Sequence, residues 1–259
     1  MRVRRLVAAA SVAALGVLSL AACGKSSPDV AAYVGDTTYS VSRVDEIYED
    51  AQEKFGEAVR GEAAQAGVTP EPEHLRTTVT RQDVVNLLVS LELGKRVAAE
   101  KNIAVPDQIQ PEQLQQGLRV PATAEYTKLW SEWADLSQAL GQQLPQPELS
   151  DAAVLAVYQA LQAPAGLEAG LPVEQVRQIF GDGGFIRNGA ALSVALQEEA
   201  ERSDTSINPR FQPLSVPSVV SNGQNLIFYG LPYLNQDGPV TDISTPKPRP
   251  TEPAVPTDG

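Results

Sequence analysis

The segment VAAYVGDTTYS, residues 30–40, carries the clearest local structure in the chain. Two short runs with β-branched and aromatic residues flank Gly35-Asp36, a pair that suits the two-residue turn of a hairpin. Ser40 then offers a helix N-cap, and apolar residues follow at helical spacing. These features predict a hairpin over residues 30–39 that leads directly into a long helix over about residues 41–66.

The chain beyond this hairpin and helix is predicted to be mostly helical. Apolar residues recur every three or four positions in six further segments, and the N-cap residues Thr80 and Ser150 precede two of them. The expected helices cover about residues 81–101, a short stretch between Pro106 and Pro121, residues 123–140 closed by Gly141, a stretch after Ser150, residues 172–180 and residues 188–202.

Three segments near the C-terminus are expected to lack helix. Residues 205–211 are predicted to be extended, because the residue before a proline, here Asn208, is disfavoured in helices. Residues 216–234 predict a weak hairpin around Asn222-Gly223. Residues 237–259 contain six prolines, few apolar residues and no periodicity, which predicts a disordered tail.

The first residues of the chain have the pattern of a bacterial secretory signal. Three arginines precede an apolar run over residues 6–20, and small residues precede the expected cut. The segment Leu20-Ala21-Ala22-Cys23 resembles the lipobox of bacterial lipoproteins, in which a diacylglycerol is attached to the cysteine thiol and the peptide bond before it is cleaved. We therefore expect cleavage before Cys23, a lipid on its thiol and a short linker over residues 23–28.

This segment has two other interpretations. Cys23 could be an ordinary small residue in a plain signal peptide. A membrane-spanning helix is disfavoured, because the apolar run is shorter than the ~20 residues that a bilayer core requires. Two acyl chains hold a protein firmly to a membrane, at about 0.8 kcal/mol per buried methylene, so the expected location is the extracytoplasmic face of the cell membrane.

The composition excludes some classes of partner. The chain has 20 basic and 32 acidic residues; removal of residues 1–22 takes away three arginines and leaves a net charge of −15. Such an acidic protein lacks the basic footprint that nucleic acids require. Cys23 is the single cysteine, so no internal disulfide can form and the fold must rest on its core.

The opening hairpin resembles the start of SurA-type periplasmic chaperones and related foldases. In that family a strand, a turn of the form V-N/G-G/D-x-x-I/Y-T/S and a helix follow one another, as residues 32–45 do here. Residues 206–211, SINPRF, are similar to the family's closing strand, which typically ends in V-N/S-P-R-Y/F-G, although Gln212 stands where glycine is usual. The resemblance implies a helical domain over residues 29–212 whose first and last segments meet, with the fourth-helix region forming an arm.

One departure from the family bears on the mechanism. Many relatives carry a parvulin prolyl isomerase domain of roughly ninety residues before the final helix, whereas this chain has only about twenty residues there, 164–184. Parvulin sites usually contain paired histidines, and this chain has only His74, outside that region. The resemblance therefore implies a chaperone-like domain without isomerase activity.

Groups suited to catalysis or metal binding are scarce. His74 has no second histidine or free thiol with which to share a zinc ion. It could be the base of a catalytic triad, but the chain has no Gly-x-Ser-x-Gly motif to supply the serine, so a solvated loop residue is expected. The glycine-rich segment 181–184 lacks the spacing and the lysine of a phosphate-binding loop and predicts a flexible turn. We expect no enzyme activity, cofactor, metal or small-molecule substrate.

The predicted fourth helix carries a stripe of aromatic residues, Tyr126, Trp130 and Trp133. Core packing accounts for such a stripe. The other interpretation is that it forms part of an apolar cradle for unfolded or extended peptide, because chaperones bind through broad, adaptable apolar surfaces. Both interpretations stay open at the level of sequence.

The sequence as a whole predicts a mainly α fold: a helical chaperone domain similar to those of SurA and trigger factor, with a small β element from its two ends. The expected segments are a signal peptide over residues 1–22, a lipidated linker over 23–28, the helical domain over 29–212, a weak hairpin segment over 213–236 and a tail over 237–259. The leading hypothesis is a membrane-anchored, non-catalytic binder of unfolded or exported proteins. The alternative is a scaffold that docks one partner of the cell envelope.

Overall fold

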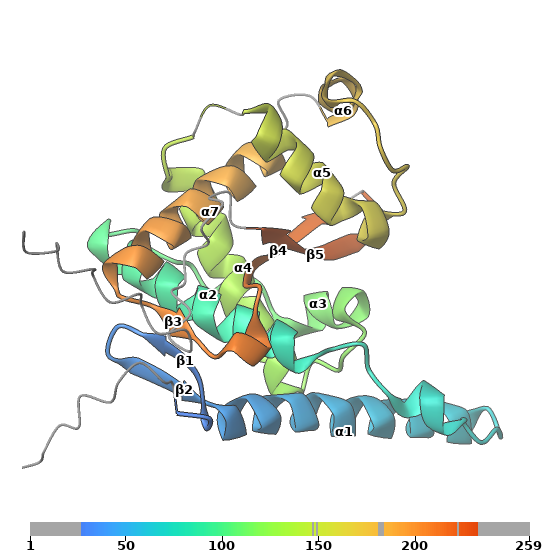
Figure 1. The fold of residues 1–259 in the computed structure, drawn as a ribbon. Helices are drawn as coiled ribbons and strands as arrows, with labels where there is room; N and C mark the ends of the chain where they lie inside the picture. The colour runs from blue at the N-terminus through green and yellow to red at the C-terminus, as the bar shows by residue number, and fades with distance from the viewer. Residues whose placement is uncertain (1–26, 147, 149, 181–183, 222, 233–259) are drawn as a thin grey trace, which may run out of the picture.

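The computed structural model describes residues 27–146, 148, 150–180, 184–221 and 223–232. These residues form a mainly helical fold with small antiparallel sheets (Figure 1). The helices are α1 Val41–Gln65, α2 Arg81–Glu100, α3 Pro111–Leu118, α4 Glu125–Gln143, α5 Asp151–Ala165, α6 Val173–Phe180 and α7 Gly184–Arg202, with single 3₁₀ turns η1 Pro72–Leu75 and η2 Pro209–Phe211. The strands are β1 Val30–Val34, β2 Thr37–Ser40, β3 Ser206–Ile207, β4 Ser215–Ser221 and β5 Leu226–Pro232.

The predicted opening hairpin is present and joins the two ends of the helical body. Val34 pairs with Thr37 across the two-residue turn, where Gly35 adopts a φ of 59° that suits glycine. Ser40 caps α1, its side chain accepting a hydrogen bond from the Arg43 amide at 3.1 Å. On its other edge β1 pairs with β3, so the sheet order is β2-β1-β3 and the first and last segments of residues 29–212 meet as expected.

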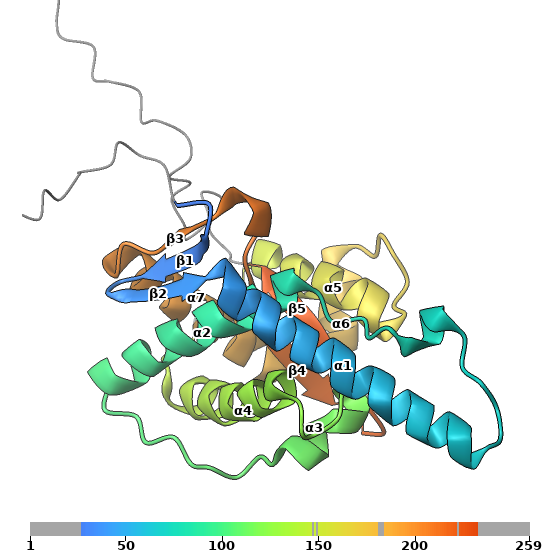
Figure 2. The same cartoon turned by 90° about the horizontal axis from the view of Figure 1, so that it is seen from below.

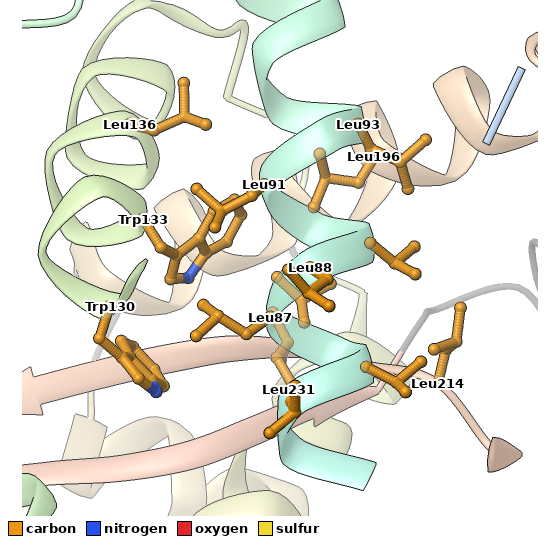
Figure 3. Close-up of a cluster of buried hydrophobic side chains, with 14 of the residues drawn as sticks. Leu87, Leu88, Leu91, Leu93, Trp130, Trp133, Leu136, Leu196, Leu214 and Leu231 are labelled. Atoms are coloured by element: carbon orange, nitrogen blue, oxygen red, sulfur yellow. The ribbon is translucent and has the colours of Figure 1, made fainter. Parts of the chain in front are cut away.

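The core lies where α2, α4 and α7 pack together, as Figure 3 shows for the leucines and tryptophans that they contribute. Leu87 and Leu93 of α2, Leu140 of α4 and Leu196 of α7 have no exposed surface. Gly94 lets α2 approach α4 closely, because a Cβ at this position would lie only 2.8 Å from the Leu136 Cδ2 atom. Helix α2 has few exposed positions in its middle, which is why its sequence is more apolar there than a surface helix requires.

The expected arm in the fourth-helix region is wrong. Helix α4 contacts α1, α2, α3 and α7 and lies inside the body, because its aromatic stripe supplies core volume. The element that extends away from the body is the C-terminal half of α1, together with η1 (Figure 2). Its residues from position 57 onward are mostly exposed.

The second hairpin is stronger than the sequence suggested, and the expected boundary at residue 212 does not mark the end of the core. Strands β4 and β5 pair over their whole length, from Ser215 with Pro232 to Ser221 with Leu226. Val216 and Leu231 are fully buried in the same core as the helices. Serine and proline lower the β propensity of this segment, so its stability comes from packing rather than from local preference.

Several predicted boundaries also need correction. Helix α4 runs through Gly141 to Gln143, because this glycine serves a close approach: an added Cβ would lie 3.2 Å from the Asn188 Cβ atom of α7. Helix α7 begins at Gly184 rather than at residue 188, and only two residues of the segment 205–211 form a strand. Asn102, two residues after the end of α2, adopts a left-handed conformation with a φ of 53°.

Some expectations fall on parts of the chain outside the described residues. These are the signal peptide with Leu20, Ala21, Ala22 and Cys23, the start of the linker, the turn at residues 181–183 and the tail over 237–259. Within the described residues, no helix combines the length and the apolar character needed to cross a membrane.

Candidate functional site

The aromatic stripe of α4 is buried in the folded protein. Tyr126, Trp130 and Trp133 retain 5%, 4% and 1% of their surface, so core packing, one of the two interpretations from sequence, accounts for most of their contacts. An open aromatic cradle does not exist on α4. Tyr126 and Trp130, however, also border a cavity, whereas Trp133 lies deeper and donates from its indole nitrogen to the Pro217 carbonyl at 2.6 Å.

This cavity has a volume of about 830 Å³. We call it the main cavity. Its walls come from five parts of the fold that are distant in sequence. They are the start of α2 with the residues before it, the end of α3, the first half of α4, the end of α5 and the β4–β5 hairpin. The site therefore exists only when the hairpin has packed onto the helices.

The wall at the start of α2 is polar and internally satisfied. Asp83 forms a capping box with Thr80, in which its Oδ2 atom accepts from the Thr80 amide at 2.9 Å. Asn86 is buried, donates to the Ser215 hydroxyl at 2.9 Å and accepts from the Ser215 amide at 3.2 Å. This pair fixes the first residue of β4 to α2 across 129 positions of sequence.

The opposite wall is aromatic. The ring of Phe228 in β5 packs edge-on against Trp130, with centroids 5.0 Å apart and an interplanar angle of 88°. Burial raises the pKa of the Tyr126 phenol, and the Asp83 carboxylate raises it further, so this hydroxyl stays protonated. The indole of Trp130, whose nitrogen is covered, acts on the Tyr126 pKa in the opposite direction and with less effect.

Helix α3 forms the third side of the main cavity. Its Gly117 lies so close to β5 that an added Cβ would sit 2.5 Å from the Phe228 Cε2 atom. A smaller cavity of about 220 Å³ begins at the same place and shares Gly117, Arg119, Asn225 and Leu226 with the main cavity. Arg119, at the end of α3, is exposed and borders both.

The groups around the main cavity are suited to binding. A protonated phenol, a carboxylate already bonded to a helix cap, an amide–hydroxyl pair and one guanidinium can orient a ligand by hydrogen bonds and charge. The apolar and aromatic side chains between them can take up a ligand's apolar surface. None of the described lining residues forms a pair of nucleophile and base that would indicate covalent catalysis.

His74 does not border this cavity; it lies on η1 at the projecting end of the molecule (Figure 2). Glu71, Glu73 and His74 can bring one ligand atom each within 4.8 Å of one another. All three side chains are exposed, which agrees with the solvated loop residue expected from sequence.

Sequence reasoning found Tyr126 and Trp130 but missed the other walls. Asn86, Gly117 and Arg119 have no motif around them, and their role follows from contacts between distant segments. One usable signal was present, since Phe228 and Tyr229 follow the Asn222-Gly223 turn signal and supply large apolar surface to a strand.

Comparison of the chain with protein-family models, with curated proteins and with solved structures finds no match in any of the three.

Proposed function

We propose that this protein is a membrane-anchored, extracytoplasmic and non-catalytic chaperone-like binder of exported proteins, and that segments of its clients bind in the main cavity. The observation that carries this proposal is the cavity itself: about 830 Å³, bordered by Tyr126, Trp130 and Phe228 on one side and by polar groups on the other. The Cys23 lipid supplies the anchor in this proposal.

The size of the main cavity favours a peptide segment. Ligand sites in proteins commonly enclose ~300–1,000 Å³, which is enough for two or three side chains of an extended peptide. Its mixed walls accept apolar side chains without demanding one shape. The acidic character of the whole chain also helps to keep a complex with an unfolded client soluble.

The likeness to SurA-type chaperones adds support at the level of topology. The chain closes its helical body by pairing β1 with β3, as the resemblance implies for that family. The β4–β5 hairpin then follows outside the segment that the two family motifs bracket, and it supplies Phe228 to the main cavity.

The test is suppression of aggregation by the purified full-length chain in mild detergent, measured by light scattering with several unrelated denatured proteins. Thr78 is exposed and borders the main cavity, so Thr78→Trp should obstruct it and reduce protection severalfold. Thr123→Trp is the matched control, because Thr123 is exposed but does not border the cavity, and it should protect like the wild type.

Three results would count against this function. Equal protection by both variants would exclude the main cavity as the binding site. No protection of any client, with one folded partner co-purifying at a fixed ratio, would favour the scaffold alternative. For the anchor, Cys23→Ser should move the protein from the membrane to the soluble fraction, and a variant that stays in the membrane at the wild-type level would contradict lipidation.

A further inference from the structure

Arg119 is an exposed arginine that borders the main cavity. It ends α3 in a left-handed conformation, with φ 53° and ψ 38°, and its backbone amide donates to the Gln115 carbonyl. Within the described residues, its guanidinium has no carboxylate partner and no hydrogen bond. Arg43, Arg81, Arg96 and Arg202, by contrast, each pair with at least one carboxylate. Arg60 and Arg76 also lack a carboxylate partner in the described part of the chain, but neither borders the main cavity or the smaller one.

Few carboxylates near the site compete with an anionic ligand for the Arg119 guanidinium. The main cavity's lining contains one carboxylate, Asp83, and that group already accepts hydrogen bonds from the amide and hydroxyl of Thr80. The chain carries 32 acidic and 20 basic residues, so a guanidinium left without a carboxylate beside a cavity is a local exception to the acidic surface. A guanidinium binds carboxylates through paired N–H donors, which favours that chemical class.

The surroundings of Arg119 differ on its two sides. The main cavity presents Trp130, Phe228 and Ile227, whereas the smaller cavity presents the side-chain amides of Gln113 and Gln116 from α3. Gly117 and Arg119 belong to both, so a ligand that runs from one cavity into the other must pass the guanidinium. Apolar surface, a cation and amides thus follow one another along one path.

We propose that this path selects extended client segments in which an apolar or aromatic residue is closely followed or preceded by an aspartate or glutamate, whose side-chain carboxylate pairs with Arg119. This inference rests on the proposed function, since it assigns the segment that the main cavity binds. The carboxylate belongs to a side chain rather than to a chain terminus, because the amide-lined cavity continues beyond Arg119 and provides donors and acceptors for further peptide backbone.

The test is fluorescence anisotropy with the full-length chain in mild detergent and short peptides blocked at both ends. The reference peptide, fluorescein-Ser-Gly-Phe-Ser-Glu-Gly-Ser-amide, is compared with versions carrying Gln or Lys in place of Glu and Ala in place of Phe. The Glu peptide should bind roughly threefold to tenfold more tightly than the Gln peptide at low salt, and the difference should shrink at 0.5 M salt as charges are screened. The Ala peptide should bind more weakly still.

Charge reversal separates the cation from a general effect of net charge. Arg119→Glu should lose the preference for Glu and bind the Lys peptide best, and Arg119→Gln should show no preference. Arg76→Glu is the matched control, because Arg76 is an exposed arginine that does not border either cavity, and it should keep the wild-type order. Circular dichroism on each variant establishes that it is folded.

The outcomes distinguish this inference from the function beneath it. Equal binding of Glu and Gln peptides by the wild type, or a preference that survives in Arg119→Glu, would overturn the role of Arg119 while protection of clients stood. A peptide with a free C-terminal carboxylate and no Glu that binds more tightly than the reference would overturn the choice of a side chain. If no peptide binds and no client is protected, both proposals fail.

Discussion

The two sheets of this protein are built in different ways. The β2-β1-β3 sheet begins with a hairpin of adjacent residues and is completed by β3, which brings the far end of the helical body back to its start. The β4–β5 hairpin follows that closure and is attached through side chains of helices, with Asn86 bonded to Ser215 and Trp133 bonded to Pro217. Both sheets therefore have backbone pairing and side-chain contacts with α2, since Arg96 also donates to the Val34 carbonyl of β1. They differ in that backbone pairing with β3 joins the two ends of the helical body in the first sheet, whereas the second sheet pairs only within its own hairpin.

This difference has a functional consequence. The β4–β5 hairpin forms a wall of the main cavity, while the β2-β1-β3 sheet, which we call the closing sheet, contributes no residue to its lining. Changes in the hairpin can therefore alter binding while the ends of the helical body stay joined. The closing sheet, conversely, should affect binding only when its loss unfolds the whole domain. The following substitutions test this separation.

The largest effect is expected from Trp133→Ala. The side chain is 1% exposed and fills the space between α4, α2 and β4, and its indole nitrogen donates to Pro217. Truncation of a buried tryptophan typically costs about 3–5 kcal/mol of unfolding free energy. Urea unfolding followed by circular dichroism measures this loss. Hydrogen exchange should show that amides of β4 lose protection before those of β1, and loss in the reverse order would contradict the separation of the two sheets.

Ile207→Ala should weaken the closing sheet by somewhat less. Ile207 is 1% exposed, pairs with Ala32 and belongs to the main core. Removal of a buried isoleucine to alanine costs about 2–5 kcal/mol, and the small strand leaves room for partial relaxation. The matched control is Ile179→Ala, because Ile179 is 60% exposed and should change the urea midpoint little.

At urea concentrations below its unfolding midpoint, where the protein is folded, the Ile207→Ala variant should still bind peptides as the wild type does. Weakened binding by folded Ile207→Ala protein would show that the closing sheet also shapes the main cavity.

Asn86→Ala tests the polar anchor of the hairpin. The substitution removes one donor and one acceptor that satisfy Ser215, and it leaves the Ser215 amide without that partner in a part-buried site. Loss of such buried hydrogen bonds costs about 1–3 kcal/mol. The urea midpoint measures the cost, and peptide binding should weaken as well, since Asn86 and Ser215 both border the cavity. An unchanged midpoint together with unchanged binding would show that the hairpin needs no anchor on α2.

Local signals in the sequence were enough for most of the helical body. The caps at Ser40, Thr80 and Ser150 start α1, α2 and α5 as expected, because each side chain accepts a hydrogen bond from an amide three residues later. The turn at Gly35 and the left-handed Asn102 are equally local. Such features depend on a few neighbouring residues, so a single sequence contains the information that predicts them.

The candidate site depended on information that one sequence does not contain. Gly141 has the local character of a helix terminator, but it lies inside α4, where its missing side chain allows Asn188 of α7 to approach closely. Gly117 likewise matters only because Phe228 lies against it. The stripe that contains Trp130 and Trp133 was compatible with core packing and with a peptide cradle at the level of sequence. The structure shows that both side chains are buried in the core, where α4 packs against α2.

The smallest effect should come from Tyr229→Phe at high pH. Burial raises the pKa of Tyr229 in β5 from about 10 to about 12. Because the folded-state pKa is the higher one, the folded protein keeps a proton that the unfolded chain releases between about pH 10 and pH 12. Stability contributed by the neutral phenol is therefore complete below pH 10 and is lost as the pH rises through that window.

Phenylalanine has no proton to lose, so the Tyr229→Phe variant should show a smaller fall in Tm between pH 9 and pH 11.5 than the wild type, measured by thermal unfolding. Tyr39 in β2 has a pKa raised to about 12 as well, first by burial and then by the charge of Glu92. Tyr39→Phe thus provides the corresponding measurement on the closing sheet. If the hairpin detaches first at high pH, Tyr229→Phe alone will preserve peptide binding there. Preservation by Tyr39→Phe instead would mean that the two sheets unfold as one unit.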